Sequence, residues 1–552
     1  MTRQRFDAVI IGAGAGGAAA AWRLTREGLK VLILEAGPWF DPDTDYSLDQ
    51  PGWERRPFPH KPNSRGKVLY GDLGKLNTAD ADLASWNRVE GRHEPGPLRT
   101  PSRSGYAHVQ GVGGSTLHYV GEAHRLHPKS FSLQTDHATG ADWPLGYADL
   151  EAHYQTCETL IGAAGPESQG ARWRSAPFPL PPHPLSPASE RLLAAAARSG
   201  MGWQANSRAA LSAAYDDRPA CNYCGQCSRG CPLRDKGSVD QTFLRHALKT
   251  GLLTIIANAP VRKILSGASG RIKAVEYLSE NGPVVQETPI AILAAGAVQT
   301  PRLLLANQGR DIPSGLANGS GQVGRNFMET LTWSSAALLP GLKNSHMGLP
   351  ADAICWTYNA PDATAGAIGG CRFTSAVHEV GLNGPIGYAT RLIPGFGTDF
   401  KQQMRDQFGS AIVVAATGAV LPDERSHIAL SPDQKDENGL PLPVIHSVLT
   451  QNSISLLHFM AKTARSMLSE IGVTEFAEEN SSWDRFTATH VFGTARMGND
   501  SADSVTNPWG RTHDHANLWI ADASLFPASG GGEAPSLTIQ ALALRAAEKI
   551  LE

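Results

Sequence analysis

Four cysteines lie within eleven residues and form the densest group of reactive side chains in this 552-residue chain. They read Cys221-Asn-Tyr-Cys224-Gly-Gln-Cys227-Ser-Arg-Gly-Cys231-Pro, which is a C-x2-C-x2-C-x3-C-P run. Bacterial ferredoxins hold iron–sulfur clusters with this spacing, whereas zinc sites usually need two separated pairs. We therefore predict that Cys221, Cys224, Cys227 and Cys231 bind an iron–sulfur cluster.

The sequence contains a single run of this kind, and this number bears on the type of cluster. In two-cluster ferredoxins the fourth cysteine of the run serves the other cluster. We therefore expect a 3Fe–4S cluster, held by three of the four thiolates, in preference to a 4Fe–4S cluster. A purely structural role for the run is the alternative. The other cysteines, Cys157, Cys355 and Cys371, are expected to be buried as small hydrophobic side chains.

A second chemically informative group stands near the N-terminus. Gly12, Gly14 and Gly17 form G-x-G-x-x-G within a strand–turn–helix–strand pattern that ends at Glu35. Such glycines permit a tight turn, a close approach of the backbone to a pyrophosphate, and close packing of the helix on the strand. The helix N-terminus attracts the phosphates. Because an acid at the position of Glu35 binds a ribose hydroxyl, we predict a site for FAD or NAD rather than NADP.

The elements that must position these residues predict an α/β protein. Helical periodicity marks residues 18–26, 147–158, 189–199, 238–250, 454–471 and 537–551. Short apolar runs predict buried strands at 6–11, 30–34, 252–257, 272–277, 289–297 and 517–521. We expect the later runs to complete the nucleotide-binding sheet. After the strand at 289–297, Thr300 and Pro301 predict the N-cap and first residue of a helix.

Other parts of the chain have a different character. Residues 332–448 contain alternating stretches and many turns, which predict the antiparallel sheet of a second domain. Residues 38–101 are rich in Pro, Gly, Asp and Arg, and we expect long loops that cover the cofactor or form a lid. A second glycine-rich turn, Gly111 to Tyr119, would let backbone N–H groups approach a ligand. A glycine-rich surface loop is the alternative for that turn.

Composition excludes several classes of function. The formal net charge of −3 gives no indication of nucleic-acid binding. No uninterrupted apolar run approaches about 18 residues, so we expect no membrane span. The first strand begins almost at once, with no signal peptide or twin-arginine leader before it. We expect a cytoplasmic protein, or a periplasmic one only if a partner carries it through export.

Together, these motifs resemble the glucose–methanol–choline (GMC) flavoprotein oxidoreductases. The matching stretches are GAGAGG with Glu35, GVGGSTLHY, AAGAVQTPRLLL, VGRNFMET, HVFGTARMG, and NLWIADASLFP with SLTIQALALR. Within the family, the cysteine run, Asp142-Trp143-Pro144 and VGRNFMET are most similar to the catalytic subunits of bacterial FAD-dependent glucose, fructose, sorbitol and gluconate dehydrogenases. The resemblance implies a Rossmann-like FAD-binding domain and a second, mainly antiparallel-sheet substrate domain.

The resemblance also implies how the chain is divided. Four segments would form the FAD-binding domain: 1–45, 100–150, 221–330 and 485–552. Residues 46–99 would form the lid and loops. Residues 151–220 and 331–484 would form the substrate-binding domain. The specificity residues are expected between Thr332 and Thr487, where the aromatic residues Trp333, Trp356, Tyr358 and Tyr388 are expected to be core rather than sugar-stacking side chains.

The resemblance assigns FAD binding to several short segments of this chain. Gly12, Gly14, Gly17 and Glu35 would hold the ADP half of FAD, and Val261 would contact the adenine. Gly113, Gly114 and Ser115 would approach the isoalloxazine or pyrophosphate, and Asp522 would lie near the ribityl chain. His118 falls where some family members carry a histidine joined covalently to the flavin. A packed, hydrogen-bonded histidine is the alternative for His118.

Catalysis in the family is hydride transfer from an alcohol carbon to the flavin, while a histidine takes the hydroxyl proton. His490 in HVFGTARMG matches that histidine. The family usually places a second His or Asn just before the Pro of the C-terminal motif, but Ala534 stands there in this chain. Alanine cannot bind an alkoxide through its side chain. The role of this second residue, which is to bind the alkoxide, is therefore absent, filled by Glu533, or supplied by the other domain. A structural carboxylate next to the last helix is the alternative for Glu533.

Three functions are consistent with the sequence. The first is FAD-dependent oxidation of an alcohol group on a sugar, glycoside or polyol, with electrons passing through the iron–sulfur cluster to a partner such as a cytochrome, alongside a small subunit. The second is an alcohol oxidase that uses O2, or an enzyme for a bulky aromatic alcohol, with a structural cysteine run. The third is a non-redox lyase of the same family that keeps FAD for structural reasons.

Overall fold

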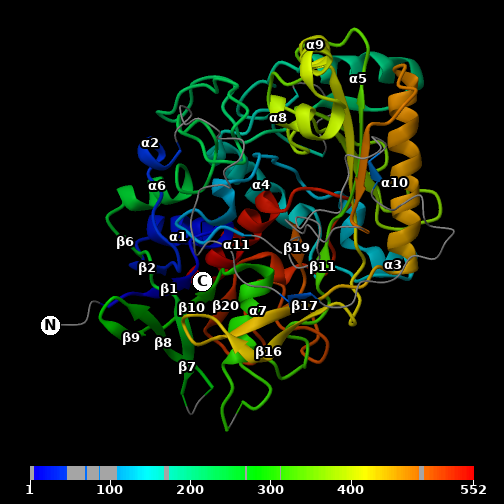
Figure 1. The fold of residues 1–552 in the computed structure, drawn as a ribbon. Helices are drawn as coiled ribbons and strands as arrows, with labels where there is room; N and C mark the ends of the chain where they lie inside the picture. The colour runs from blue at the N-terminus through cyan, green and yellow to red at the C-terminus, as the bar shows by residue number, and fades with distance from the viewer. Residues whose placement is uncertain are drawn as a thin grey trace.

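The structure of the protein, a computed structural model, describes residues 5–46, 69–70, 86–87, 108–166, 173–267, 270–310, 312–483 and 490–552. Two sheets of different kinds dominate it (Figure 1). One is parallel and contains the N-terminal strand. The other is antiparallel and is built mainly from the second half of the chain. The predicted lid, 46–99, lies almost entirely outside the described residues.

The parallel sheet has five strands in the order β20-β10-β1-β2-β6, with every neighbouring pair parallel. The strands are β1 (Ala8–Ile11), β2 (Val31–Leu34), β6 (Leu253–Ile256), β10 (Ala291–Leu293) and β20 (Leu518–Ile520). Four of them are buried at every position, as unbroken apolar runs predict for strands covered on both faces. The sheet therefore assembles from segments hundreds of residues apart.

Helices from both ends of the chain cover this sheet. The N-terminal helix α1 (Ala15–Arg26) packs beside the C-terminal helix α11 (Ser536–Leu551), blue against red in Figure 1. Further helices pack around them: α4 (Ala148–Ile161) on α11, α6 (Phe243–Lys249) on α1 and β6, and α7 (Gly296–Ala306) on the turn at 523–525 and on the strands at 427–435 and 441–446. Apart from α7, these helices lie where the helical patterns predict them, with ends shifted by a few residues.

The helix α7 begins about one turn earlier than the sequence pattern predicts, so the predicted start at Thr300 is wrong. The Thr300 hydroxyl does not cap the helix but donates to Oδ2 of Asp522 at 2.6 Å. Pro301 lies inside the helix, where it lacks the N–H that would bond the carbonyl of Ala297. The hydroxyl of Thr494 donates to that carbonyl instead, at 2.8 Å. A tertiary contact therefore replaces the missing helical hydrogen bond.

A second prediction fails nearby. The strand expected at 272–277 exists, but it belongs to a separate antiparallel sheet and not to the nucleotide-binding sheet. That sheet contains β7 (Val261–Ser266), β8 (Ile272–Ser279) and β9 (Gly282–Glu287). In β8 buried residues are interspersed with exposed and half-buried ones, which is characteristic of an antiparallel sheet with one solvated face.

The large sheet has seven strands in the order β4-β18-β12-β15-β14-β13-β5, and all its pairs are antiparallel. Its strands are β4 (Trp86–Asn87), β5 (Trp203–Ala205), β12 (Leu331–Leu338), β13 (Ala353–Cys355), β14 (Cys371–Ser375), β15 (Ala411–Gly418) and β18 (Glu478–Ser481). The long helix α10 (Gln451–Glu470) packs on β12 and β15, and α5 (Pro187–Ser199) lies against the same sheet. The predicted antiparallel sheet is confirmed.

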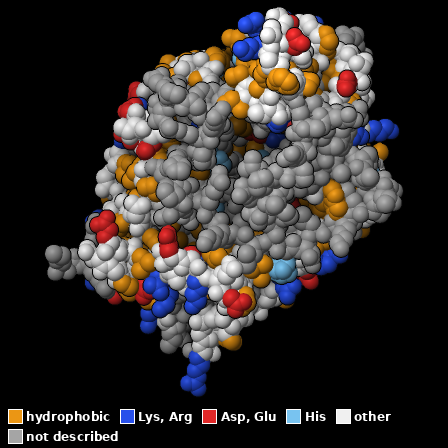
Figure 2. Space-filling view, in the orientation of Figure 1, with side chains coloured by type: hydrophobic (Ala, Val, Ile, Leu, Met, Phe, Trp, Pro, Cys, Tyr) orange, Lys and Arg blue, Asp and Glu red, His pale blue; other side chains and the backbone are white. Residues whose placement is uncertain are grey.

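Smaller elements complete the fold. They are the three-stranded sheet of β3 (Leu69–Tyr70), β16 (His427–Lys435) and β17 (Pro441–His446), the pair β11 (Met328–Glu329) and β19 (Val491–Phe492), and the short helices α2 (Pro42–Asp45), α3 (Leu133–His137), α8 (Pro385–Gly387) and α9 (Gly397–Gln407). Single turns of other helical types span 114–117, 128–131, 388–392 and 523–525. Figure 2 shows apolar side chains gathered over α8 and α9 at the top of the view. Phe396, just before α9, is 91% exposed.

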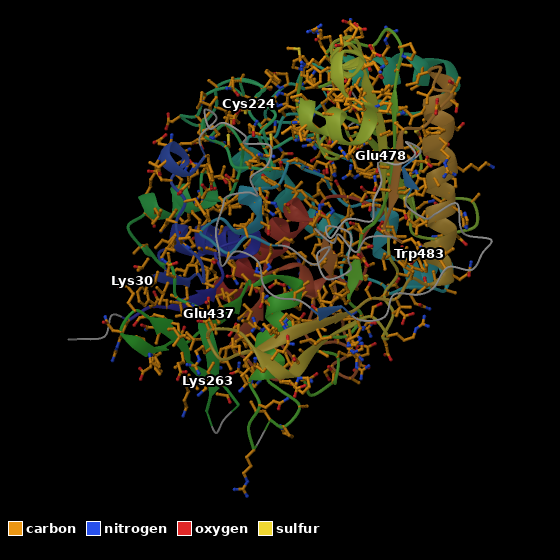
Figure 3. The ribbon with its side chains drawn as sticks, in the orientation of Figure 1. Lys30, Cys224, Lys263, Glu437, Glu478 and Trp483 are labelled. Carbon is orange, nitrogen blue, oxygen red and sulfur yellow. The ribbon has the colours of Figure 1, made fainter. Side chains whose placement is uncertain are left out.

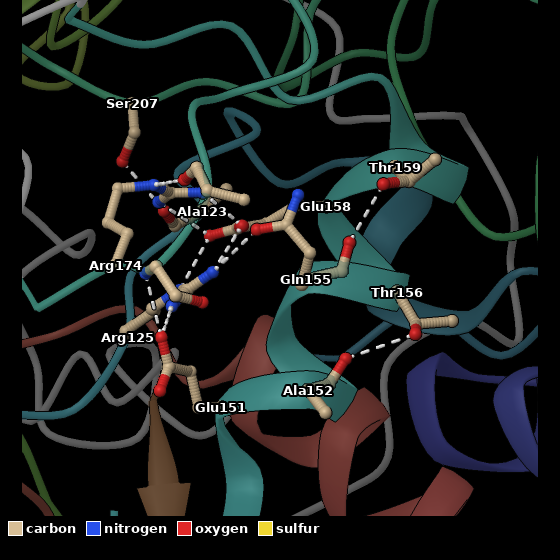
Figure 4. A network of polar contacts seen from close by, with 12 residues as sticks. Ala123, Arg125, Glu151, Ala152, Gln155, Thr156, Glu158, Thr159, Arg174 and Ser207 are labelled. Atoms are coloured by element: carbon tan, nitrogen blue, oxygen red, sulfur yellow. Dashed lines mark hydrogen bonds and ion pairs between the residues drawn. The ribbon is translucent and has the colours of Figure 1, made fainter. Parts of the chain in front are cut away.

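A buried ionic network ties α4 to the segment that leads into the active-site region (Figure 4). Glu158 on α4 is fully buried and accepts from Nε of Arg125 at 3.0 Å and from Nη2 at 2.7 Å. Arg174 donates to the same carboxylate. Two arginines thus satisfy both oxygens of one carboxylate, which is the condition under which a buried charge is tolerated.

The three isolated cysteines are fully buried in the hydrophobic core, as predicted: Cys157, Cys355 and Cys371. Burial raises the pKa of the Cys157 and Cys371 thiols far above the ordinary value, so both are neutral. None of the helices in the described ranges combines the length and the apolar character that a membrane crossing needs.

Candidate active site

A cavity of about 1370 Å³ is lined by residues of both large sheets. The parallel sheet contributes Ile11 and Leu34 at the carboxyl ends of β1 and β2, where ligands of open α/β sheets bind. The antiparallel sheet contributes Trp333, Thr374 and Ala416 from three adjacent strands. Figure 2 shows the molecule hollowed near its centre, below the α8–α9 region. The cavity is large enough for a dinucleotide together with a substrate.

The first glycine turn forms one wall of the cavity. Gly12 has φ +105°, and a Cβ there would lie 2.5 Å from the carbonyl oxygen of Ala294. A Cβ on Gly17 would lie 2.0 Å from the carbonyl oxygen of Gly12, so helix and turn pack closer than any side chain allows. Gly14 lines the cavity at the start of α1, which presents its free N–H groups there.

Gly16 is also required for the close packing of α1, although the G-x-G-x-x-G spacing does not single it out. A Cβ on Gly16 would lie 1.6 Å from the carbonyl oxygen of Ala521, next to Asp522, and 3.2 Å from Cγ2 of Ile539. The glycine therefore lets α1 approach β20 and α11. The only sequence signal for it is the adjacent pair of glycines in GAGAGG.

Glu35 follows β2 and lies at the same end of the cavity. Its Oε2 accepts from the backbone N–H of Ala13 at 2.8 Å, and its Oε1 accepts from that of Gly37 at 2.9 Å. Burial raises the pKa of Glu35 to about 7, against the lowering effect of these N–H donors. The carboxylate is thus oriented by the first glycine turn, and its contact with a ribose stays a prediction.

The second glycine turn packs directly on the first. The N–H of Gly113, whose φ is +115°, donates to the carbonyl of Ala13 at 3.1 Å. A Cβ on Gly114 would lie 2.8 Å from Cα of Gly14, so the absence of a side chain at Gly114 lets the two turns touch. Gly114 and Ser115 line the cavity. The glycine-rich stretch is therefore part of the site and not a surface loop.

Asp522 and Val261 complete the predicted cofactor set. Oδ2 of Asp522 accepts from the N–H of Gly296 at 2.9 Å and Oδ1 from that of Ser524 at 2.9 Å. Burial raises the pKa of Asp522 above its ordinary value. Asp522 lines the cavity beside α7, and Val261 lines it at the start of β7.

These residues fit a bound dinucleotide. Glycine turns without side-chain atoms, a helix N-terminus, a carboxylate after the second strand and a second acid beside α7 all face one continuous cavity. Each group has the chemistry that a pyrophosphate, a ribose or a hydroxylated chain requires. FAD would be held by Glu35, Val261 and the two glycine turns at one end and by Asp522 nearer the other.

His490 also lines this cavity, directly before β19 (Val491–Phe492). Burial, followed by the Arg372 guanidinium, lowers the pKa of His490 to about 4, while Glu122 opposes the change. The imidazole is therefore neutral at physiological pH and able to accept a proton. Its Nδ1 is buried with no hydrogen-bond partner in the described part of the chain. The nitrogen that can meet a substrate is therefore Nε2.

His118 also lines the cavity, at the end of the second glycine turn. Burial, with the cationic Lys236 as the next contribution, lowers the pKa of His118 to about 4. The contact of His118 with the flavin stays a prediction, and so does the covalent link.

Glu533, the predicted helper of His490, does not lie in the wall of the cavity. It is fully buried. Its Oε1 accepts from the backbone N–H of His127 at 3.0 Å and from Nδ2 of Asn359 at 2.9 Å. This geometry favours the structural alternative, in which the carboxylate joins the C-terminal motif to the neighbouring loops. Ala534 lines the cavity itself and offers it only a methyl group.

Two charged residues that the sequence did not single out face His490 across the cavity. Glu122 and Arg372 both line it and form an ion pair of 2.6 Å. Burial disfavours the Glu122 carboxylate, but Arg372 outweighs it and lowers the pKa of Glu122 to about 2. Neither residue belongs to a motif with a chemical signature, so no sequence signal was available for the pair.

Three residues of the cysteine run line the same cavity: Gly225, Ser228 and Arg229. The buried ammonium of Lys236 donates to the carbonyl of Cys227 at 2.7 Å and to that of Leu117 at 2.8 Å. Lys236 therefore joins the cysteine run to the second glycine turn.

The four thiols are not arranged as a set of metal ligands. Within the described ranges, no three His, Cys, Asp or Glu side chains gather as a metal ion would need. Cys231 donates its thiol hydrogen to Asp235, and burial raises the pKa of Cys231 to about 12. Burial also raises the pKa of Cys221, Cys224 and Cys227, and Cys224 is exposed at the upper surface in Figure 3. The structure therefore gives no support for an iron–sulfur cluster among the described residues, and the cluster remains a prediction from spacing.

Comparison with known families decides the class of protein. Two family models described as GMC oxidoreductase match residues 146–332 and 422–543, and a model described as NAD(P)-binding Rossmann-like domain matches residues 10–39. The chain is a GMC oxidoreductase. The resemblance drawn from its motifs is confirmed, and the chain is an FAD-dependent oxidoreductase that acts on CH–OH groups.

Individual relatives of this GMC oxidoreductase match it over nearly its whole length. The fructose dehydrogenase large subunit of Gluconobacter japonicus is 29% identical, over 99% of this chain and 97% of the relative. The 2-methyl-1,2-propanediol dehydrogenase of Mycolicibacterium austroafricanum is 27% identical, over 99% and 95%. The crystal structure of pyridoxine 4-oxidase from Mesorbium loti superposes with a TM-score of 0.60 at 19% identity, covering 99% of each chain, and shows the same fold.

Proposed function

We propose that this GMC oxidoreductase oxidises an alcohol group on a sugar, glycoside or polyol, with His490 as the base. When bound, FAD supplies the acceptor for the hydride that leaves the alcohol carbon. Nε2 of His490 takes the proton of the hydroxyl group, so that the carbinol becomes a carbonyl. The alcohol loses one hydride and one proton in all.

The observation that carries this proposal is the state of His490. It is a neutral imidazole in the same cavity as the two glycine turns, and its inner nitrogen has no partner among the described residues. A structural histidine would be expected to use its ring nitrogens in hydrogen bonds, as His124 does with Asn206 and the N–H of Ala534. An unengaged base beside a flavin site is what proton removal from an alcohol requires.

The class of substrate rests on the lining of the cavity and on the relatives. The antiparallel sheet offers hydroxyl, amide and charged side chains there, among them Thr332, Thr374, Thr417, Asn480 and Arg372. Such groups match a molecule with several hydroxyls better than a purely apolar alcohol. The names of the two dehydrogenase relatives include a sugar and a diol.

The test is an anaerobic screen of the purified holoenzyme. Sugars, polyols and aromatic alcohols are added without oxygen, and bleaching of the flavin absorbance is recorded. Rapid bleaching by a polyhydroxylated compound supports the proposal, and preference for a bulky aromatic alcohol would contradict its substrate class. If no alcohol bleaches the flavin, the lyase alternative is favoured. A His490→Ala variant with normal FAD and full turnover would remove His490 as the base.

The acceptor of the electrons is a separate part of the proposal. We propose a protein acceptor rather than O2, since one relative is named as the large subunit of a dehydrogenase and so has a partner subunit. Turnover is compared with O2 alone and with an artificial one-electron acceptor under argon. Fast turnover with O2 alone would favour the oxidase alternative.

No electron transfer step is assigned to the cysteine run, because no group of side chains that could hold a metal ion is found in the described part of the chain. Iron and acid-labile sulfide measured per FAD in anaerobically purified protein decide whether a cluster is present. Three irons per FAD would support the predicted 3Fe–4S cluster, in which case the run rearranges when it binds the cluster. Absence of iron and sulfide from protein that retains FAD would support the structural alternative.

A further inference from the structure

The wall of the cavity at position 534 lacks a side chain that can form hydrogen bonds. Ala534 lines the cavity there, and its backbone N–H is already donated to Nδ1 of His124 at 3.1 Å. Glu533 is engaged behind the wall by His127 and Asn359. Position 534 itself therefore presents no side chain that can bind the oxygen of a reacting hydroxyl group.

Arg372 reaches this part of the wall from the other sheet. It lies on β14, opposite Thr417 of β15, and its Nε donates to the carbonyl of Gly532 at 2.5 Å. A Cβ on Gly532, where φ is +94°, would lie 2.1 Å from the carbonyl oxygen of Thr417 and 3.3 Å from Cγ of Arg372. The glycine thus allows the C-terminal motif to sit on the antiparallel sheet and brings Arg372 within two residues of Ala534.

Glu122 holds the guanidinium in place and neutralises it. Its Oε2 accepts from Nη2 of Arg372 at 2.6 Å, and its Oε1 accepts from Nδ2 of Asn206 at 2.9 Å. The two side chains are only 8% and 4% exposed. Because the pair is nearly neutral overall, it provides little attraction for a free anion and suits an uncharged polar group better.

Both members of the pair have capacity left for a ligand. Nη1 of Arg372 has no acceptor among the described residues, and a carboxylate can accept more bonds than Glu122 receives. The pair therefore offers a donor and an acceptor side by side in the cavity. Two hydroxyl groups on adjacent carbons match this arrangement, since one can accept from the guanidinium while the other donates to the carboxylate.

We propose that Arg372 takes over the role of the side chain missing at position 534, and that Arg372 with Glu122 selects substrates carrying a hydroxyl next to the carbon that is oxidised. Nη1 of Arg372 donates to the reacting oxygen while Nε2 of His490 removes its proton and the hydride leaves the carbon for the flavin. Arg372 keeps its own protons. Glu122 accepts from the adjacent hydroxyl. This inference rests on the proposed function and specifies its substrate class.

The test uses holoenzyme and matched pairs of alcohols. One pair is the best polyol from the anaerobic screen and its analogue lacking the adjacent hydroxyl. The other is cyclohexane-1,2-diol and cyclohexanol, with cyclohexane-1,4-diol to separate adjacency from hydroxyl number. We expect the adjacent hydroxyl to raise kcat/KM of the unmodified enzyme by about 10- to 100-fold, the effect of one hydrogen bond to a charged group.

The variants separate the two roles. Arg372→Met should lower kcat about 100-fold for every alcohol, Arg372→Lys should retain part of it, and Ala534→Asn in the Arg372→Met background should restore part of it. Glu122→Gln should reduce the preference for the diol and affect KM more than kcat. Arg174→Met is the control, since it removes an arginine from a buried pair that does not line the cavity.

FAD content and thermal melting are recorded for each variant, so that loss of fold is separated from loss of chemistry. The inference would be overturned by an unchanged kcat in Arg372→Met holoenzyme. It would also be overturned by equal kcat/KM values for the 1,2-diol, the 1,4-diol and cyclohexanol. In either case, bleaching of the flavin by an alcohol would still support the proposed function. If no alcohol bleaches the flavin of the unmodified enzyme, the proposed function fails first and the inference fails with it.

Discussion

The pH dependence of substrate oxidation tests the electrostatics of the site directly. His490 accepts a proton only when it is neutral, so kcat/KM must fall as the pH drops through its pKa in the free enzyme. Burial and the nearby guanidinium of Arg372 place that pKa at about 4 instead of the ordinary value. We therefore expect activity to persist in moderately acidic solution, where an unperturbed histidine would already be protonated.

The size of the expected change in kcat/KM follows from the shift in the pKa of His490. At about pH 5, a histidine of ordinary pKa near 6.5 is only about 3% neutral, whereas one with a pKa near 4 is about 90% neutral. The two cases differ by about 30-fold in kcat/KM at that pH. The shift is therefore large enough to be read from a rate profile without fitting small differences.

The assay is kcat/KM with an artificial acceptor under argon, measured between about pH 4.5 and 8. FAD content is followed at every pH, because Glu35 has a pKa of about 7 and can affect FAD retention in the same range. His490→Ala should lower the plateau by about 10²- to 10⁴-fold and remove the acid limb. His378→Asn is the matched control, since His378 lines the same cavity and burial lowers its pKa to about 4 as well.

A flat profile down to about pH 5 in the unmodified enzyme and in His378→Asn supports the assignment. An acid limb centred near the ordinary histidine value, with FAD still bound, would refute the account of the site electrostatics. An acid limb that survives in His490→Ala would show that another group is the base.

The remaining predictions concern cofactor binding and stability. Gly16→Val should yield protein without FAD or cost more than about 3 kcal/mol in stability, because a Cβ there meets the Ala521 carbonyl at 1.6 Å; thermal melting and flavin content measure this. Glu35→Gln should fold but weaken FAD binding by about 10- to 100-fold, since an amide presents one acceptor where a carboxylate presents two to the backbone N–H groups; an FAD titration of apoprotein measures this. Arg125→Met should cost about 3 kcal/mol in denaturant unfolding because it removes two of the hydrogen bonds to the buried Glu158 carboxylate, and the rate of flavin reduction should not change. An unfolding midpoint unchanged in Arg125→Met would contradict the assigned role of that network.

The nucleotide-binding part of the fold was predictable because its signals are local. Gly12, Gly14 and Gly17 form a recognisable spacing within one turn, and unbroken apolar strands are recognisable wherever they occur. The start of α7 was not predictable, since the Ala297 carbonyl left without a partner by Pro301 is satisfied by Thr494, almost two hundred residues away. Local cap rules do not include such a partner.

The cysteine run shows the opposite difficulty. Its spacing is a strong local pattern, but a metal site also needs the side chains to converge, and that depends on how Lys236 and Asp235 anchor the loop. The spacing therefore establishes only that four thiols are close in sequence. Their chemistry depends on packing that the pattern does not contain.

The sequence by itself determined the family, the FAD-type turn, the base His490 as a hypothesis, and the absence of a polar side chain at Ala534. Only the tertiary structure decided what faces that position. Arg372 and Glu122 are 250 residues apart and meet because β14 lies against the glycine turn of the C-terminal motif. Sequence motifs record constraints between neighbours along the chain. The ion pair in this cavity is a contact between residues that are close in space but distant in sequence. Neither residue shows in the sequence that it will form this contact, because the contact exists only after the sheets have assembled.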